Sequence, residues 1–252
     1  QRYVEGALEK ILQILEFLGL NWDEGPKVGG DKGPYIQSER KDLYQKHAQE
    51  LIDKGFAYED EGAVRFKVEK GKTWEWKDLV HDEISFQSDV IEDFIILKSD
   101  GFPTYHLAVV VDDHFMEISD VLRGDEWISS TPKHLMLYSA FGWEPPHFGH
   151  LPIIVGADKA KLSKRHGAKS VLDYKDEGYL PEAIINFMAL MGWSPPAEIA
   201  RGQLGEKEKE IFTLEELKET FSLDRINPTS PVFNLEKLNW FNNQWIKKIS
   251  DD

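Results

Sequence analysis

The segment His150–Ser170, HLPIIVGADKAKLSKRHGAKS, gives the clearest indication of the fold. It opens with an apolar run typical of a buried strand, passes through the turn-forming residues Gly156–Asp158, and leads into a helical pattern after Ser170. Between Lys159 and Ser170 lie five lysine or arginine residues and one histidine. A strand, a loop and a helix in this order place the basic loop at an edge of an α/β sheet, where such proteins bind ligands.

The charge balance limits the partners that the chain can bind. Aspartate and glutamate number 45 against 30 lysines and arginines, which gives a net charge of −15. Such an excess of acid repels polyanions, so a nucleic-acid partner requires a local basic face. With 252 residues, of which 41% are hydrophobic, the chain is long enough for two or three compact units.

Cysteine usage and hydropathy exclude further classes. The chain has no cysteine, so disulfides and thiolate metal sites are excluded. No stretch reaches the roughly 20 consecutive apolar residues of a membrane helix, and the first residues lack a basic region followed by an apolar run. We therefore expect a cytoplasmic protein without a membrane partner.

The first hundred or so residues change from helical to β-rich. Apolar residues recur at helical spacing from Val4 to a stop at Gly19, and again from Ser38 to Gly55. The segment between them, 21–40, is rich in glycine and proline and is expected to form a shaped, functional loop. Residues 57–99 then contain the short runs AVRFKV, TWEWKD, EISFQS and DFIILK, which predict strands.

Strands and helices alternate in the rest of the chain. YHLAVVVDD, Tyr105–Asp113, is a continuous apolar run that predicts a buried parallel strand. The segment Thr131–Gly142 predicts a helix with Thr131 as its N-cap residue. After Ser170 the chain is predicted to be helical, with a capping box at Thr213–Glu216. Together these patterns predict an α/β protein with a helical C-terminal unit.

The spacing of charges in the basic loop points to a polyphosphate ligand. Lys161 and Lys164 flank Ser163, so two ammonium groups can converge on one polyphosphate while the loop's amide and hydroxyl groups complete its shell. Lysine suits this role because it is a compact charge on a flexible stem. The alternative is an ordinary solvated basic loop.

The motif KLSKR, residues 161–165, resembles the second signature motif of the class I aminoacyl-tRNA synthetases. With HGAKSV after it and VVDDHFMEISDVLRGDEW before it, the chain is similar to bacterial-type glutamyl-tRNA synthetases. Three further segments resemble that family in the same order: GLNWDEGPKVGGDKGPYIQSER, DGFPTYHLAVVVDD and SSTPKHLMLYSAFGW. The likeness runs from Tyr3 to about Ile249.

The resemblance implies an enzyme that activates glutamate with ATP, forms glutamyl-adenylate, and transfers the glutamyl group to the terminal ribose of tRNA(Glu). Its expected partners are L-glutamate, ATP with Mg²⁺, and tRNA(Glu), and a monomer is expected. Lys161, Ser163 and Lys164 match the family's mobile catalytic loop, in which both lysines bind the triphosphate of ATP. The role implied for this loop is electrostatic stabilisation of the leaving pyrophosphate.

Four more residues match the family's substrate pocket. Tyr105 and Arg123 fall in the glutamate site, where they offer a hydroxyl and a bidentate fork for a carboxylate. Glu126 and Trp127 fall on the adenosine side of the ATP site. Without the resemblance, a residue such as Tyr105 is more often a core aromatic and one such as Arg123 more often a surface ion-pair partner.

Metal binding is not expected of the protein itself. The pair Asp112 and Asp113 is interpreted as structural or polar lining, with metal ligation as the alternative, because amino-acid adenylation needs no protein nucleophile or obligatory base. Many relatives carry a longer insert between the positions of Tyr58 and Ala63, sometimes with a cysteine-rich zinc site. Here the chain passes almost directly from helix to strand, and no zinc is expected.

The resemblance also implies four parts. Residues 1–35 and 105–155 are expected to form two portions of a Rossmann-type class I synthetase fold, interrupted at 36–104 by a β-rich insertion that holds the tRNA acceptor end. Residues 156–252 carry the lysine loop and a helical unit that contacts the tRNA stem. Arg65, Lys67 and Lys133 are candidate phosphate contacts, although each residue of this kind is more often a plain surface charge.

Two features of the family have no counterpart in the sequence. The first signature motif belongs upstream of the position of Gln1, and the anticodon-binding domains follow the position of Ile249. The chain is therefore expected to be the core portion of a glutamate-tRNA ligase. The alternatives are a related ligase that glutamylates a modified base in tRNA(Asp), and a non-catalytic tRNA-binding fragment. The segment EKLNWFNNQWIKK favours the synthetase, because the short relatives diverge after the lysine loop.

Overall fold

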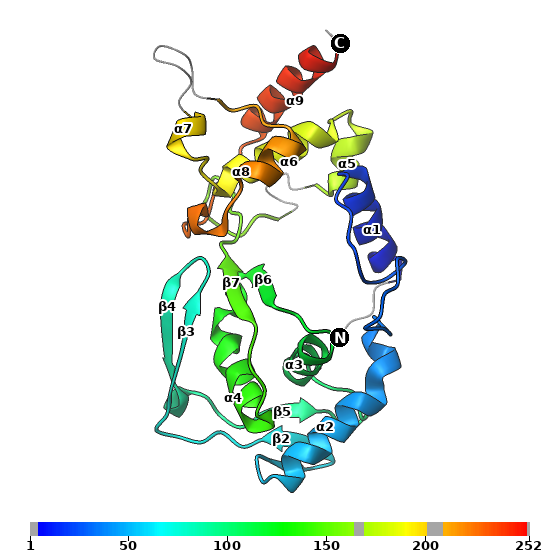
Figure 1. Cartoon of the computed structure of the whole chain (residues 1–252), viewed down its shortest axis with the longest axis vertical. Coiled ribbons are helices and arrows are strands. Elements are labelled where there is room, and N and C mark those ends of the chain that lie inside the picture. The colour runs from blue at the N-terminus through cyan, green and yellow to red at the C-terminus, as the bar shows by residue number, and fades with distance from the viewer. Residues whose placement is uncertain (1–4, 164–168, 201–208, 251–252) are drawn as a thin grey trace. The chain divides into compact units, whose positions relative to one another are not determined.

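The structure is a computed structural model that describes residues 5–163, 169–200 and 209–250. Contacts divide the chain into two compact units, which are described one at a time. One unit is Trp22–Leu151, and the other combines Gln1–Asn21 with Pro152–Asp252 (Figure 1). The four parts implied by the family resemblance are a different kind of division, and their boundaries stay predictions.

The unit Trp22–Leu151 begins with helices and an antiparallel sheet. The elements, in chain order, are η1 Gln37–Arg40, α2 Lys41–Asp53, β1 Ala57–Asp60, β2 Ala63–Phe66 and β5 Phe94–Leu97. The strand order is β1-β2-β5. Strands β1 and β2 are joined by a two-residue turn at Glu61 and Gly62, whose φ angles are 50° and 81°. Positive φ at both central residues is the backbone geometry that matches the twist of a tight hairpin. The passage between Tyr58 and Ala63 is short, as predicted, but it does not run from helix to strand: it joins β1 to β2, and helix α2 ends earlier, at Asp53.

A second sheet has the strand order β4-β3-β7-β6. Its strands are β3 Thr73–Asp78, β4 Asp82–Gln87, β6 Asp120–Gly124 and β7 His147–Leu151. β3 and β4 form an antiparallel hairpin, whereas β6 and β7 run parallel. β3 joins β7 in parallel where Asp78 lies opposite Phe148. One sheet thus unites a hairpin from the β-rich stretch with the later parallel strands (Figure 1).

The prediction of a strand at Tyr105–Asp113 is wrong, because Tyr105–Phe115 forms helix α3. Leu107, Ala108, Val110 and Val111 are buried, since α3 packs against α2, α4 and β5. A continuous apolar run fits a helix that is buried on most sides as well as a buried strand, so periodicity could not separate the two. Tertiary packing has overridden the strand preference of the three valines.

Two boundaries also differ from those predicted. The run HLPIIV forms strand only through Leu151, where β7 ends before Pro152, a residue that cannot donate a ladder hydrogen bond. Helix α4 spans Thr131–Phe141, so Thr131 is its first residue and Ser130 is the N-cap. The Thr131 hydroxyl accepts a hydrogen bond from Arg123 instead of capping the helix.

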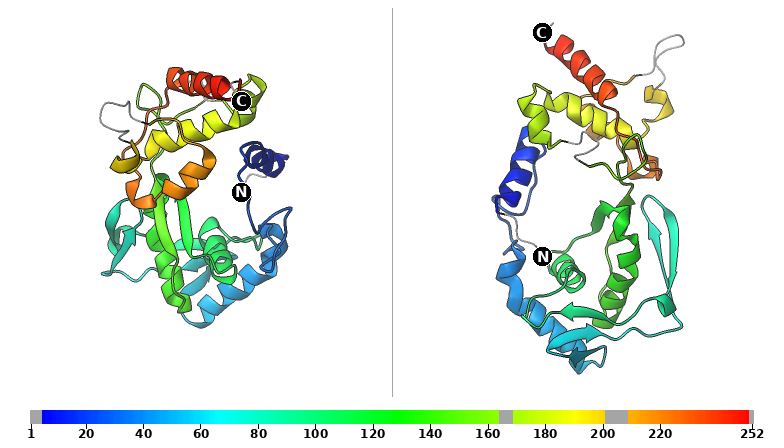
Figure 2. Two further views of the ribbon diagram at one scale, coloured as in Figure 1. Left: turned by 45° about the horizontal axis from the view of Figure 1, so that its top comes forward. Right: turned by 180° about the vertical axis from the view of Figure 1, so that it is seen from behind.

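The other unit is helical, as predicted for the chain after Ser170. Its helices are α1 Ala7–Phe17, α5 Val171–Asp176, α6 Pro181–Gly192, α7 Ala197–Ala200, α8 Leu214–Thr220 and α9 Leu235–Ser250, with a short turn η5 Leu223–Arg225. α9 packs on α6 around Phe187, Leu238 and Phe241 (Figure 2). The capping box is confirmed: the Thr213 hydroxyl accepts from Glu216 N–H at 3.2 Å, and Glu216 accepts from Thr213 N–H at 2.9 Å.

Two further helical elements lie in the larger sheet-containing unit, η2 Ser88–Val90 and η3 Asp125–Ser130. The core of this unit is a single cluster in which Tyr44, Leu51, Ile96, Leu107 and Leu137 are fully buried. This core fixes α3 and α4 beside the strands that carry Asp78, Arg123 and His150. Across the described ranges, none of the helices is both long and apolar enough to cross a membrane.

Candidate functional site

Arg123, on β6, is held by two imidazole and two hydroxyl side chains. Its Nε donates to His150 Nε2 at 3.1 Å and its Nη2 to Thr131 Oγ1 at 2.7 Å. Its Nη1 lies 3.2 Å from His134 Nδ1 and 3.4 Å from the Tyr105 hydroxyl. Arginine stays charged and offers only donors, so each of these groups must act as an acceptor. Within the part of the chain that the structure describes, no carboxylate forms an ion pair with Arg123.

His150 connects Arg123 to a buried carboxylate. The side chains of His150 and Asp78 are both 0% exposed, and His150 Nδ1 hydrogen-bonds to the Asp78 carboxylate. Asp78 also accepts the backbone N–H groups of His150, Val80 and His81 at 3.0–3.2 Å, and the indole N–H of Trp76 at 3.3 Å. Burial alone would raise the pKa of Asp78, but the hydrogen bonds from His150 and the backbone hold that pKa well below its ordinary value.

Two more histidines continue the row of imidazoles on the other side of Arg123. His134 is almost fully buried, and its Nε2 lies 3.1 Å from His106 Nδ1. Burial, with the positive charges of Arg123 and His106 next in size, lowers the pKa of His134 well below its ordinary value. Burial, followed by the charges of Lys133 and Arg123, lowers the pKa of His106 to about 4. Both rings are therefore neutral near pH 7.

Aromatic rings border the guanidinium. Tyr105 is the first residue of α3, and its ring centroid lies 4.4 Å from that of Trp127 in η3. Trp127 is 36% exposed, so this pair forms an accessible apolar surface. The Arg123 guanidinium lies 5.4 Å from the ring of Phe148. A planar cation without a carboxylate partner, beside a hydroxyl and an exposed aromatic, is suited to bind an anionic group of a ligand that also has an apolar or planar part.

The two adjacent aspartates of α3 have different surroundings. Asp112 is buried and accepts hydrogen bonds from Arg40 at 2.7 Å, Tyr44 at 2.8 Å and Gln37 at 3.0 Å. Asp113 has its pKa raised to about 6, first by burial and then by the negative charge of Asp112. Asp112 therefore ties α3 to η1 and α2, which agrees with a structural role. Among the residues that the structure describes, no group of three or more His, Cys, Asp or Glu side chains could hold a metal ion.

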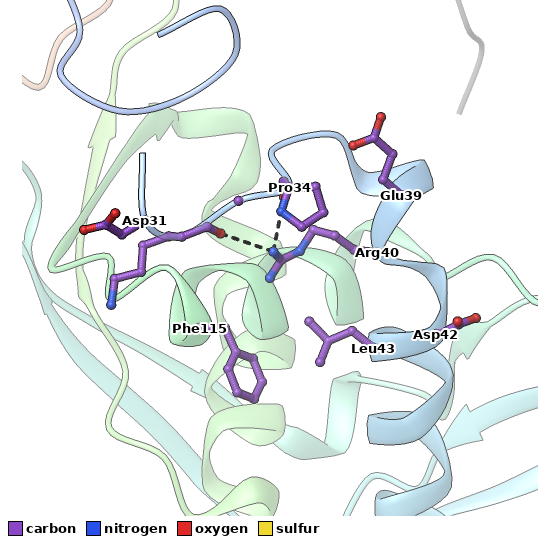
Figure 3. Close-up of a pocket in the computed structure, with 9 residues that line it drawn as sticks. Asp31, Pro34, Glu39, Arg40, Asp42, Leu43 and Phe115 are labelled. Carbon is purple, nitrogen blue, oxygen red and sulfur yellow. Dashed lines mark hydrogen bonds between the residues drawn. The ribbon is translucent and has the colours of Figure 1, made fainter. Parts of the chain in front are cut away.

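A cavity of about 400 Å³ lies on the Arg40 side of the same unit. It is lined by Asp31, Lys32, Gly33, Pro34, Glu39, Arg40, Asp42, Leu43 and Phe115 (Figure 3). The Arg40 guanidinium is paired with Asp112 and also donates to the carbonyls of Lys32 and Pro34, at 3.4 and 3.2 Å. The charge of Arg40 is thus already compensated within the protein, and no predicted site residue lines this cavity.

The lysine loop starts with a tight turn in the helical unit. Val155 pairs with Lys161, and Gly156 N–H donates to the Ala160 carbonyl at 2.9 Å. Lys161 is exposed, and Ser163 is partly buried. Lys164 lies outside the described residues. The structure thus brings Tyr105, Arg123 and Trp127 together, with Glu126 beside Trp127 in η3, whereas Lys161 and Ser163 belong to the other unit.

Comparison with known proteins identifies the family. The family model described as tRNA synthetases class I (E and Q), catalytic domain, matches residues 1–63 and 59–240. The chain therefore belongs to this family, and its α/β architecture is the class I synthetase catalytic fold.

Individual relatives are glutamate-tRNA ligases. The chain is 46% identical to the glutamate-tRNA ligase of Dehalococcoides mccartyi over 286 residues, covering 99% of this chain and 57% of the relative. It is 45% identical to that of Carboxydothermus hydrogenoformans over 282 residues, covering 95% of this chain and 57% of the relative. A crystal structure of a glutamate tRNA ligase from Elizabethkingia meningosepticum, in complex with its amino acid, superposes with a TM-score of 0.87 at 32% identity, covering 98% of this chain and 61% of that one.

The chain is shorter than the relatives that it matches. The chain spans less than two thirds of each of these relatives. The alignment with the Dehalococcoides mccartyi ligase is also 34 positions longer than the 252 residues of the chain, so that relative has residues without a counterpart here. The two matches to the family model meet at residues 59–63, the tight turn between β1 and β2.

Of the side chains around Arg123, Tyr105 was predicted as a site residue, whereas Asp78, His106, Thr131, His134 and His150 were not. One local signal was available: Thr131 and His134 are three residues apart in a predicted helix and so share a face. Asp78 and His150 are separated by 72 positions, and nothing local in the sequence links them.

Proposed function

We propose that this chain is the core of an enzyme that attaches L-glutamate to tRNA(Glu) by way of glutamyl-adenylate, with ATP as the second substrate. The observation that carries the proposal is the Arg123 guanidinium, which is charged, partly exposed and, among the described residues, hydrogen-bonded to imidazole and hydroxyl groups and to no carboxylate. Family membership and the glutamate-tRNA ligases among the relatives support it.

In the proposed mechanism, Arg123 binds a carboxylate of glutamate through its remaining Nη2 N–H and through the Nη1 N–H that otherwise contacts the Tyr105 hydroxyl, and that hydroxyl then donates to the same carboxylate. Trp127 and Glu126 line the adenosine side of the ATP site. These contacts hold the glutamate carboxylate close to the α-phosphate of ATP, where the oxygen attacks phosphorus and pyrophosphate leaves. The gain comes from positioning and from charge stabilisation, not from a protein nucleophile.

Lys161, Ser163 and Lys164 are proposed to bind the triphosphate and to stabilise the negative charge that develops on the leaving pyrophosphate. Mg²⁺ is proposed to accompany ATP and would supply charge neutralisation at its phosphate oxygens. The described residues contain no cluster that would bind the ion by protein groups alone. In this proposal the lysine loop supplies the chain's own positive charge to the phosphates.

The direct test is ATP–pyrophosphate exchange with the protein as its gene encodes it. We expect exchange that depends on glutamate, with and without added tRNA(Glu), and much less exchange with glutamine or aspartate. Aminoacylation of tRNA(Glu) and tRNA(Asp) in parallel separates the synthetase from a ligase that modifies tRNA(Asp). Glutamate-dependent exchange followed by transfer only to tRNA(Asp) would assign the second activity, and no exchange in any condition would leave a tRNA-binding role.

Two finer statements belong to the same proposal. We propose that the protein works in the cytoplasm and that it is a monomer. Light scattering after size-exclusion chromatography, at several protein concentrations, tests the second point. A mass that stays at the value for one chain supports it, and a mass that doubles at higher concentration contradicts it.

A further inference from the structure

We propose that Asp78, His150 and His134 are positioning residues for Arg123, and that they fix the guanidinium plane without neutralising its charge. The inference rests on the proposed function, in which Arg123 binds a carboxylate of glutamate. These three buried side chains need not touch the ligand. Their role is to orient the Arg123 guanidinium, which does.

The contacts to Asp78 and Arg123 together select one arrangement of protons on the two imidazoles, in which the Thr131 hydroxyl, 3.1 Å from His150 Nε2, is a second donor to that nitrogen. The Asp78 carboxylate only accepts, so His150 Nδ1 carries a proton and donates it. Arg123 Nε–H only donates, so His150 Nε2 must be unprotonated to accept it at 3.1 Å. His150 is therefore the neutral Nδ1–H tautomer.

The same logic fixes the opposite tautomer on His134. Arg123 Nη1 can only donate, so His134 Nδ1 must be unprotonated to accept it at 3.2 Å. The proton of His134 is then on Nε2, which faces His106 Nδ1 at 3.1 Å. The guanidinium thus donates to two neutral imidazoles, His150 and His134, whose lone pairs approach it from different directions.

The register of the sheet places these groups. Arg123 on β6 and His150 on β7 are direct partners in the parallel pair, and Asp78 ends β3 on the other side of β7. His134 and Thr131 lie one turn apart on α4. Three neighbouring strands and one helix therefore determine where the guanidinium lies, and none of them is a loop.

The electrostatic consequence follows from where the negative charge sits. A carboxylate bonded directly to Arg123 would orient it equally well but would compete with the carboxylate of a ligand. Here the carboxylate of Asp78 is one imidazole ring away from Arg123, and its oxygens are already occupied by N–H groups from His150, Val80 and His81. Arg123 is therefore rigidly held yet still positive toward a ligand, which is what preorganised binding of an anion requires.

The first experiment reads the protons directly and does not depend on activity. Long-range ¹H–¹⁵N correlation spectra of the chain at pH 7 distinguish Nδ1–H from Nε2–H imidazoles. We expect His150 as the Nδ1–H tautomer and His134 as the Nε2–H tautomer. His150 in the charged or the Nε2–H form, or His134 as the Nδ1–H tautomer, would overturn the inference.

The second experiment uses kinetics of exchange in the protein as its gene encodes it. His150→Gln keeps an amide N–H for Asp78 and a carbonyl for Arg123, whereas His150→Ala keeps neither. We expect His150→Ala to raise the KM for glutamate by about 10- to 100-fold with the KM for ATP nearly unchanged, and His150→Gln to restore most of the difference. Thermal unfolding of both variants shows whether either has simply lost its fold.

His147→Gln is the matched control, because His147 lies on the same strand but its side chain is 73% exposed. It should leave both KM values unchanged. Equal increases in the two KM values, or a His150→Gln variant no better than His150→Ala, would contradict positioning. Absence of glutamate-dependent exchange in the unmodified protein would refute the proposed function instead, and the spectra would still decide the proton arrangement.

Discussion

Arg123 and His150 lie opposite each other on the neighbouring parallel strands β6 and β7, and Arg123 Nε donates to His150 Nε2 at 3.1 Å. The register of β6 on β7 thus places the two side chains within hydrogen-bonding distance. Since the imidazole must accept, the guanidinium keeps its full charge and its orientation together. This relationship makes Arg123 the residue whose replacement is most informative.

Arg123→Lys should raise the KM for glutamate in ATP–pyrophosphate exchange by about 10- to 100-fold while changing the KM for ATP less than about threefold. A lysine ammonium retains the charge but cannot present two parallel donors. Arg225→Lys is the control, because Arg225 lies in the other unit and donates to the backbone carbonyls of Ser194 and Pro195. Equal changes in both KM values, or no change in either, would place the glutamate site elsewhere.

Thr131→Val should lower the free energy of unfolding by about 1–3 kcal/mol in urea denaturation. The substitution preserves the shape of the fully buried side chain but removes the acceptor of Arg123 Nη2, which lies 2.7 Å from the hydroxyl. Thr73→Val, at an exposed position of β3, should change stability by less than about 0.5 kcal/mol. A Thr131→Val variant as stable as the unmodified chain would show that the hydroxyl contributes nothing to holding Arg123.

The contribution of His106 to the stability of the folded chain should fall as the pH falls. Its pKa is lowered to about 4 in the folded chain, first by burial and then by the charges of Lys133 and Arg123. Between about pH 6.5 and pH 4 the unfolded chain therefore binds a proton that the folded chain does not, so this residue's contribution to stability falls as the pH falls. At pH 5.5 an ordinary histidine is about 90% protonated, but His106 should remain mostly neutral by ¹⁵N chemical shift.

Asp113 acts in the opposite direction, because its pKa is raised to about 6 and the folded chain takes up its proton first as the pH falls. The contribution of His106 is therefore isolated by comparing stability curves of the unmodified chain and His106→Gln. The variant should lose less stability between pH 7 and pH 5. Parallel curves would contradict a lowered pKa at His106.

Lys164→Ala should slow ATP–pyrophosphate exchange with little loss of glutamate binding. Loss of one charged phosphate contact in a water-poor site costs on the order of 2–4 kcal/mol of transition-state stabilisation. Lys159→Ala is the control, because Lys159 is exposed at the turn before the motif and lies outside KLSKR. A normal exchange rate in Lys164→Ala would remove the loop from the mechanism.

The helical unit and its capping box were predictable because their signals are local. The capping box at Thr213–Glu216 needs only two residues three positions apart, and it is present as predicted. Tyr105 shows the limit, since YHLAVVVDD is apolar on every side and its helix is decided by packing against α2, α4 and β5. A substrate-binding role for Tyr105 and Arg123 could be proposed only through family resemblance, not from their own spacing.

The group around Arg123 could not be predicted for a different reason. Asp78, Arg123 and His150 meet because three strands far apart in the chain are neighbours in one sheet. A single sequence does not record which strands pair. Thr131 illustrates the same point, because its hydroxyl fits an N-cap by pattern but bonds Arg123 in the structure.

The two-residue turn at Glu61 and Gly62 closes the hairpin of β1 and β2 without any further residues. Asp78 and Arg123 lie later in the chain and in the other sheet. The turn is therefore a position at which a segment can be inserted or omitted without changing the strands that carry these residues. Grafting the longer segment of a relative between Glu61 and Gly62 should leave the imidazole tautomers and the melting temperature of the host nearly unchanged, whereas a shift in either would show that the two sheets are coupled. A change in the length of the chain at this turn is therefore expected to leave the geometry around the Arg123 guanidinium unchanged.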